Sequence, residues 1–275
     1  MNILVIGDIV GNPGRQAVKT LLPKIKHREF VDFTVANAEN AAGGSGLTPS
    51  IAMELLEMGI DVLTNGDHIW DRKEILEVID KEQRILRPLN YPEGSPGNGS
   101  IILSVQQSRR SSQENGVSHS AVGNKVGVIN LVGRVFMQAV ECPFRAAMKQ
   151  INEMRGETPV IVVDIHAEAT SEKLALCYYL DGLVTAVCGT HTHIQTADER
   201  IFPKSAAYIT DLGMTGPFDS VLGRRPEQII RRFITGLPAR FEMADSNIQL
   251  QGVVINCDDK TGRANSIKRI QEKLD

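Results

Sequence analysis

The sequence predicts an α/β protein in which two stacked sheets are covered by helices on their outer faces. Short apolar runs alternate with helical patterns through most of the 275 residues, and the carboxyl-terminal part carries consecutive strand patterns instead. Hydrophobic residues make up 42% of the chain, which is sufficient for a sizeable core. Alternating elements followed by a strand-rich end are typical of this fold class.

The first part of the chain alternates strictly between strand and helix patterns. Asn12-Pro13 and Thr48-Pro49 each look like a helix start, because a capping side chain precedes a proline that suits the first turn. The predicted elements are, in order, strand 3–6, helix 14–26, strand 33–37, helix 49–58, strand 61–64 and helix 72–80.

The alternation continues from residue 100 and then gives way to strands alone. Residues 106–124 are rich in Ser, Gln, Arg and Asn, and we expect them to form a flexible loop inserted into a single domain 1–275. Asp245-Ser246-Asn247 is predicted to be a turn between two strands. The elements predicted here are strands 100–105, 126–131, 160–164, 183–188 and 206–209, helices 143–155, 171–180 and 226–233, and final strands 239–244, 248–255 and 266–271.

Charge and cysteine content limit the classes of function. The net charge is −3 with acidic and basic residues mixed, so no stable nucleic-acid complex is expected, although a metal could locally attract a nucleotide. The four cysteines form no CxxC pair and have apolar neighbours, which indicates reduced buried thiols in a cytoplasmic protein. The amino terminus lacks the basic start of a signal peptide, and no apolar run approaches the roughly 20 residues that span a bilayer, so no membrane contact is expected.

Polar residues follow the ends of five predicted strands. In an α/β sheet the carboxyl ends of strands gather along one edge, so we expect these side chains to meet. Mixed carboxylate and imidazole ligands suit Mn, Fe, Zn or Ni better than Ca or Mg, and the absence of thiols argues against a structural zinc site. Their number and types predict two adjacent transition-metal sites. The residues are Asp8, Glu39, Asn40, Asp67, His68, Asp164, His166, His191 and His193.

Two of the imidazoles stand at the end of one predicted strand, in the stretch Gly189-Thr190-His191-Thr192-His193. Residues i and i+2 of an extended segment point to the same side, so we expect both rings to project from the end of this strand toward the predicted metal sites. Asp164 is open to two interpretations: it either supports His166 from behind or is only a strand-end charge.

The order of these motifs resembles that of calcineurin-like metallophosphoesterases, and more closely the bacterial YmdB-type subfamily of cyclic-nucleotide phosphodiesterases. The resemblance covers nearly the whole chain apart from 106–124. It implies a single metallophosphoesterase domain with a four-layer α-β-β-α sandwich of two mixed sheets. The motifs that carry it are Ile6-Gly7-Asp8-Ile9-Val10-Gly11, Asn37-Ala38-Glu39-Asn40-Ala41-Ala42, Gly66-Asp67-His68, His166-Ala167-Glu168-Ala169-Thr170-Ser171-Glu172-Lys173, Gly189-Thr190-His191-Thr192-His193 and Thr210-Asp211-Leu212-Gly213-Met214-Thr215-Gly216-Pro217.

The resemblance also implies a role for each site residue. Asp8 and His193 correspond to ligands of one metal, and Asn40 to a position that contacts that metal or the phosphate. Glu39 corresponds to the carboxylate that bridges both metals. The ligands of the other metal are Asp67, His166 and His191, and His68 corresponds to the general acid. Iron is the first expectation for both ions, with manganese or zinc as alternatives.

Three positions depart from the broader superfamily. Val10 stands where a histidine is usual, and Glu39 replaces an aspartate, both as in the subfamily. Asp67 stands where asparagine is expected. Its extra negative charge should tighten metal binding and weaken the binding of an anionic substrate.

The function implied is hydrolysis of 2′,3′-cyclic nucleotides, with 3′,5′-cyclic nucleotides as further candidates, by a hydroxide that bridges the two metals. His68 would protonate the leaving ribose oxygen. Two alternatives stay open: a metal-binding regulatory or scaffold protein with weak turnover, and a phosphomonoesterase or nuclease built on the same core. The subunit number is also open, and a homo-oligomer is one of the outcomes considered.

Overall fold

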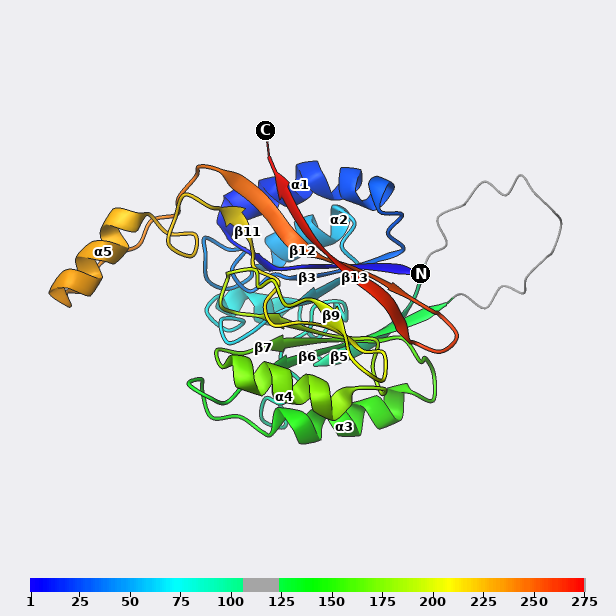
Figure 1. Ribbon diagram of the computed structural model, residues 1–275. Coiled ribbons are helices and arrows are strands. Elements are labelled where there is room, and N and C mark those ends of the chain that lie inside the picture. Colours follow the sequence, from blue (N-terminus) through cyan, green and yellow to red (C-terminus); the bar gives the residue numbers. More distant parts are fainter. Residues whose placement is uncertain (106–123, 275) are drawn as a thin grey trace.

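The computed structural model describes residues 1–105 and 124–274 and consists of two mixed β-sheets packed face to face between two layers of helices (Figure 1). The predicted α/β fold with helices outside is therefore confirmed. Residues 106–123, most of the predicted insertion, lie outside the described residues. No described helix is both long enough and apolar enough to cross a membrane.

Within the described residues the first sheet has seven strands in the order β2-β11-β12-β1-β3-β4, and β13 pairs with β12. β1 runs parallel to β3 and antiparallel to β12, and β3 runs parallel to β4. Its strands are β1 (Asn2–Ile6), β2 (Asp8–Ile9), β3 (Phe33–Asn37), β4 (Val62–Thr64), β11 (Met214–Pro217), β12 (Ile248–Cys257) and β13 (Ala264–Lys273).

The second sheet, as far as residues 1–105 and 124–274 form it, has six strands in the order β5-β6-β7-β8-β10-β9. Its central strands β6, β7, β8 and β10 are all parallel, whereas β5 and β9 are antiparallel edges. Its strands are β5 (Ser100–Ser104), β6 (Lys125–Val132), β7 (Ile161–His166), β8 (Ala186–Thr190), β9 (Arg200–Ile201) and β10 (Ala207–Ile209).

Four helices cover the outer faces of the sheets, α1 and α2 on the first and α3 and α4 on the second (Figure 1). α5 instead projects from the body, and none of its residues is buried. The helices are α1 (Gly11–Arg28), α2 (Pro49–Glu57), the 3-10 helix η1 (Lys73–Glu77), α3 (Pro143–Met154), α4 (Thr170–Leu180) and α5 (Pro226–Thr235).

Alternation along the central strands explains why both faces of each sheet are buried. Ile3 and Val5 point into the core between the sheets, whereas Leu4 and Ile6 pack under the helices of the first sheet. Strands buried on both faces read as continuous apolar runs, as β1 does. The parallel strands of both sheets therefore stay in the interior, and their carboxyl ends come out together at one end of the sandwich.

Several element boundaries differ from the predictions. α1 begins at Gly11 rather than after an Asn12 cap: Gly11 has φ +60°, and its N–H donates to the Asn40 carbonyl, so the chain turns into the helix earlier. Asn12 Oδ1 accepts from Arg15 instead. The cap predicted at Thr48 is confirmed, since its side chain accepts from Ile51 N–H at 3.5 Å.

The predicted strand 239–244 is wrong. Met243 makes only an isolated bridge with Arg224, because β1, β11 and β13 already pair with β12. The predicted helix 72–80 is the shorter 3-10 helix η1, and the strand predicted at 183–188 is shifted to Ala186–Thr190. The short strands β2, β9 and β11 were not predicted, because two to four residues give too little periodicity.

Candidate metal centre

The candidate site lies where the carboxyl ends of both sheets meet. Each chemically important side chain stands at or just beyond a strand end, because the strand itself is filled by core residues. The first sheet supplies Asp8 after β1, Glu39 and Asn40 after β3, and Asp67 and His68 after β4; the second sheet supplies His166 from β7, and His191 and His193 after β8.

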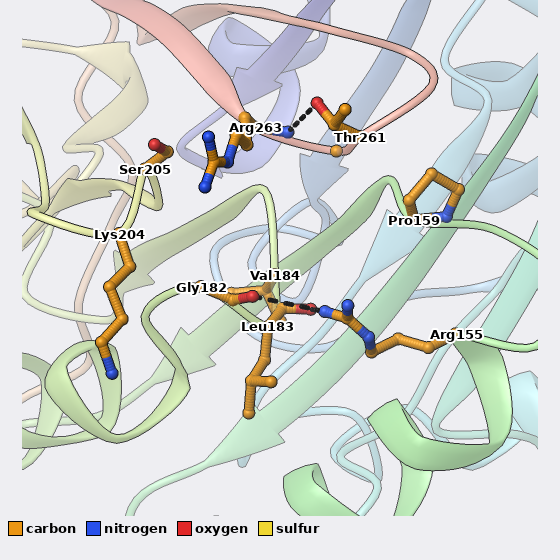
Figure 2. Close-up of a pocket in the computed structure, with 10 residues that line it drawn as sticks. Arg155, Pro159, Gly182, Leu183, Val184, Lys204, Ser205, Thr261 and Arg263 are labelled. Carbon is orange, nitrogen blue, oxygen red and sulfur yellow. Dashed lines mark hydrogen bonds between the residues drawn. The ribbon is translucent and has the colours of Figure 1, made fainter.

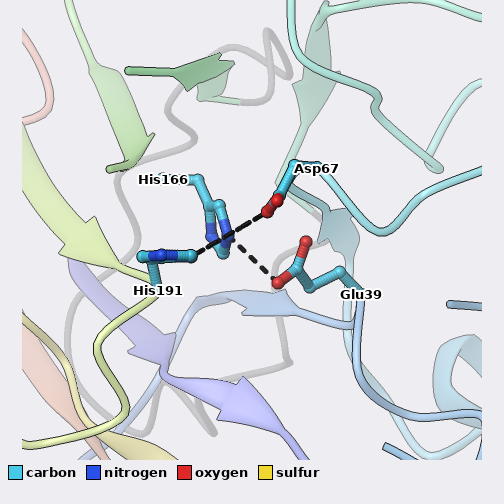
Figure 3. A group of neighbouring side chains, drawn as sticks. All are labelled: Glu39, Asp67, His166 and His191. Atoms are coloured by element: carbon cyan, nitrogen blue, oxygen red, sulfur yellow. Dashed lines mark hydrogen bonds and ion pairs between the residues drawn. The ribbon is translucent and has the colours of Figure 1, made fainter. Parts of the chain in front are cut away.

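Four of these side chains converge on one point (Figure 3). Potential ligand atoms of Glu39, Asp67, His166 and His191 all lie within 4.8 Å of one another. His166 Nε2 is the centre of the group, at 3.0 Å from Glu39 Oε1, 3.2 Å from Asp67 Oδ1 and 2.9 Å from His191 Nδ1. We refer to these four residues as the first group.

Asp8, Asn40 and His193 form a second group directly beside it. His193 Nε2 lies 3.2 Å from Asn40 Nδ2 and 3.7 Å from Asp8 Oδ1. Asn40 also donates to Glu39 Oε1 at 3.1 Å, so Glu39 touches both groups. The seven residues expected to bind metal are thus contiguous, with Glu39 between the two groups.

The donor atoms fit transition-metal ions. Asp8 Oδ1, Asp67 Oδ1 and His193 Nδ1 are buried and accept or donate no hydrogen bond within the described chain. Asp67 Oδ1 is near His166, but the ion pair lacks hydrogen-bond geometry. Buried polar atoms are almost always satisfied, and the two carboxylate oxygens both lie near the His166 ring, 3.9 Å from Nδ1 and 3.2 Å from Nε2, where a cation would satisfy them. Carboxylate oxygen and imidazole nitrogen together are ligands for iron, manganese or zinc.

Electrostatics point to the same conclusion. Burial by itself lowers the pKa of His166, but Glu39, Asp67 and Asp8 outweigh it and raise that pKa well above its ordinary value. Burial raises the pKa of Asp8 well above its ordinary value, and Glu39 adds to this. Burial also lowers the pKa of His193, to about 4. The carboxylates thus favour a positive charge at His166 Nε2, where a metal ion can replace the proton.

Hydrogen bonds behind His166 fix which of its nitrogens faces the group. Its Nδ1 lies 3.0 Å from Thr190 Oγ1, and that hydroxyl donates its single proton to Asp164 Oδ1 at 2.8 Å. The hydroxyl therefore accepts from His166 Nδ1–H, which leaves Nε2 to face the ligand atoms. Of the two interpretations of Asp164, the structure favours the support of His166, through Thr190.

The expectation that His191 and His193 project from an extended strand is wrong. β8 ends at Thr190, and the two histidines have φ values of +97° and +64°. The turn takes His191 into the first group and His193 into the second. Backbone hydrogen bonds to buried charged side chains hold the turn in this conformation, and the local sequence does not reveal them.

His68 stands at the rim of the site with partners that were not anticipated. Its Nδ1 lies 2.8 Å from Asp71 Oδ2, and Ser45 donates to the same carboxylate oxygen. The His68 backbone N–H donates to Glu39 Oε2 at 3.1 Å. The i, i+3 spacing of His68 and Asp71 could have predicted their contact. Ser45 is distant in sequence, and no local pattern predicts that it joins them. Glu168 Oε2 lies 3.1 Å from His191 Nε2, a contact that the sequence did not predict.

A separate hollow of about 340 Å³ lies at the opposite, amino ends of the second sheet's strands (Figure 2). Arg155, Lys204 and Arg263 line it, but Arg155 already donates to the Gly182 and Leu183 carbonyls. The Lys204 side chain extends away from Arg263 (Figure 2). The hollow therefore shows no convergent set of groups like that of the two groups above.

Comparison with known proteins finds relatives that match nearly the whole chain. A sequence model of the YmdB-like protein family matches residues 4–270. A 2′,3′-cyclic-nucleotide 2′-phosphodiesterase of Bacillus subtilis (strain 168) is 49% identical over 270 residues, which cover 98% of this chain and 96% of the relative. A relative in Mycoplasma genitalium, named as a putative phosphatase/phosphodiesterase, is 36% identical over 100% of this chain and 94% of its own.

Solved structures show the same fold. A hypothetical protein from Thermus thermophilus superposes with a TM-score of 0.88 at 37% identity, over 99% of both chains. A novel phosphatase from Mycoplasma pneumoniae superposes with a TM-score of 0.88 at 34% identity, over 99% of this chain and 93% of that one.

We predict that Mn²⁺ stabilises the parent chain and that His166→Ala removes most of this effect, because Nε2 is the centre of the first group. Mn²⁺ at a hundred times its Kd should add about 2.7 kcal/mol to the free energy of unfolding. Urea unfolding with EDTA or with Mn²⁺ measures the gain for each variant separately. His27→Ala removes an exposed histidine and should retain the full gain. An equal gain for His166→Ala and the parent would contradict the prediction.

Proposed function

Because the chain belongs to the YmdB-like family, we propose that it is a metal-dependent phosphodiesterase that hydrolyses cyclic nucleotides. The observation that carries the proposal is the pair of contiguous ligand groups with His68 at their rim. The name of the Bacillus subtilis relative makes 2′,3′-cyclic nucleotides the first substrates to test, with 3′,5′-cyclic nucleotides next.

We propose that the two groups hold two metal ions. The first group would bind one ion, and Asp8, Asn40 and His193 would bind the other, with Glu39 shared. Iron is the first candidate, with manganese or zinc as alternatives, since these ligands accept all three. When bound, such ions supply Lewis acidity and activate a water molecule for attack on phosphorus.

His68 is the proposed general acid. Asp71 Oδ2, 2.8 Å from Nδ1, orients the ring, and Nε2 is the proposed proton donor to the leaving ribose oxygen. The bond from the His68 backbone to Glu39 ties the position of this ring to the shared metal ligand. Asp71 is thus a proposed positioning residue that acts through His68.

We predict that His68→Ala lowers kcat for a nucleoside 2′,3′-cyclic phosphate by about 10²–10⁴-fold, the usual contribution of a general acid. Metal content by elemental analysis should stay at the parent value, because His68 belongs to neither ligand group. Asp71→Asn should give a smaller decrease, and His27→Ala none. Undiminished turnover by His68→Ala with both metals bound would remove His68 from this role. Two bound metals without hydrolysis of any diester by the parent would favour the scaffold alternative.

A second prediction concerns Asp67. Asp67→Asn removes one negative charge from the first group, and a unit charge near a cation contributes up to about 4 kcal/mol at an effective dielectric constant of 20. We expect Mn²⁺ to bind at least about tenfold more weakly and KM for a cyclic nucleotide to fall, measured by calorimetry and by steady-state kinetics at saturating Mn²⁺. Asp80→Asn, an exposed carboxylate on the same segment, is the control. Unchanged Mn²⁺ affinity would contradict the prediction.

We further propose a single metallophosphoesterase domain over 1–275, since both sheets contribute to each ligand group. The four cysteines are free, and Cys177, Cys188 and Cys257 are buried, which supports the cytoplasm as its compartment.

We also propose that α5 joins two copies of the chain. Its Ile230, Phe233 and Ile234 side chains are 52%, 84% and 78% exposed, and a ten-residue helix is too short to be stable alone in water. Antiparallel pairing of two α5 helices would bury these side chains and bring the acidic first turn, Glu227, toward the basic last turn, Arg232.

We predict that Phe233→Asp converts a dimer into a monomer, because the charge falls in the centre of the proposed contact. Light scattering after size-exclusion chromatography measures the mass directly. Phe30→Asp, at a phenylalanine that is 69% exposed elsewhere, should leave the mass unchanged. A monomeric parent chain would overturn the proposal.

A further inference from the structure

Lys173 is a buried charge that the proposed reaction does not use. Lysines are almost never fully buried unless they are paired. Lys173, in α4, has no exposed surface, and its Nζ donates to Asp211 Oδ2 at 2.8 Å and to the Thr190 carbonyl at 2.7 Å. Asp211 is equally buried, and its other oxygen accepts from Gly213 N–H at 2.9 Å. These hydrogen bonds of Lys173 and Asp211 join residues at or just after the ends of β8 and β10.

Two further partners of this pair are peptide groups of the 190–193 turn, which carries both histidines. The Thr190 carbonyl accepts from Lys173, and the Thr192 N–H donates to Asp211 at 3.1 Å. Between them, the His191 N–H donates to Asp8 Oδ2 at 3.2 Å. Three consecutive residues are thus bonded through their backbones to buried charged side chains.

This turn needs such support. Left-handed backbone conformations at non-glycine residues are strained, and they persist only when their surroundings enforce them. His191 and His193 both adopt them. The Lys173 side chain also passes over Gly189, where an added Cβ would come within 2.8 Å of Lys173 Cδ and 1.8 Å of the Thr210 carbonyl oxygen. The absence of a side chain at Gly189 therefore leaves the room that the Lys173 side chain needs to reach the turn.

We propose that Lys173 and Asp211 are positioning residues whose ion pair directs His191 to the first group and His193 to the second. Without the pair, the 190–193 turn relaxes toward ordinary backbone angles, and the two imidazoles no longer reach separate ions. The proposal rests on the proposed metal binding. It adds the reason why neighbouring histidines serve two sites.

The test compares stability with Mn²⁺ affinity in two variants. Lys173→Met keeps the aliphatic stem but leaves Asp211 charged and unpaired, so it should lose both unfolding free energy and Mn²⁺ affinity. Lys173→Met combined with Asp211→Asn leaves no unpaired charge and should recover stability. It still lacks the donor to the Thr190 carbonyl, so Mn²⁺ should bind about 10–100-fold more weakly than to the parent, as for other residues behind metal ligands.

A matched control removes a buried carboxylate at the other end of α4. Asp181 accepts from the Lys204 and Ala206 N–H groups at 2.9 and 3.1 Å, far from the turn. Asp181→Asn should lose stability and keep the parent's Mn²⁺ affinity. Urea unfolding in EDTA gives stability, and titration followed by electron paramagnetic resonance gives the number and affinity of bound Mn²⁺ ions.

The outcomes separate this proposal from the proposed activity. A double variant that binds as many Mn²⁺ ions as the parent with the same affinity overturns the positioning role. Loss of affinity in the double variant with recovered stability supports it. Hydrolysis of a 2′,3′-cyclic nucleotide by the parent is measured independently: a parent that binds Mn²⁺ without hydrolysis overturns the proposed function and leaves the positioning role intact.

Discussion

The arrangement of the site depends on one buried carboxylate, Asp164, which lies between the two sheets. From the first sheet it accepts hydrogen bonds from Thr64 and Asn37, and from the second sheet it accepts one from Thr190. A buried carboxylate without such donors would be strongly unfavourable, so the sheets have to meet with these three side chains in register. That register brings the strand ends of both sheets to the same place. Apolar packing between the sheets could not specify it so narrowly, because it is non-directional.

Because this register brings the strand ends of both sheets together, it also concentrates negatively charged side chains at the site. Asp8, Glu39 and Asp67 lie close to the buried His166 ring. Burial by itself lowers the pKa of His166, but the combined negative charge of these carboxylates raises it well above its ordinary value. Either a proton at His166 Nε2 or bound metal ions would compensate this negative charge. Asp211 lies close enough to add to this potential at Asp8, and its own charge is matched by Lys173.

Most of the strands, and the residues that meet at their ends, follow from local sequence pattern, whereas the backbone that joins them does not. β1, β3 and β7 are apolar over nearly their whole length, so their ends, and hence Asp8, Glu39 and His166, could be located from local pattern alone. The turn after β8 could not, because its left-handed angles are held by Lys173 and Asp211, which are separated from it in sequence. The strand predicted at 239–244 failed for a similar reason: neighbouring strands had already filled the positions beside β12.

Asp67 shows how the charge balance and the chemistry compete. Burial raises the pKa of Asp67, but His166, His68 and His191 lower it well below the ordinary value, so the carboxylate stays ionised in the absence of metal. Its charge favours cations in the first group and also opposes an approaching phosphate. An asparagine there would offer an amide donor to the phosphate but would leave His166 with one fewer carboxylate. If the proposed function holds, the charge at this position would set the balance between binding metal ions tightly and attracting an anionic substrate.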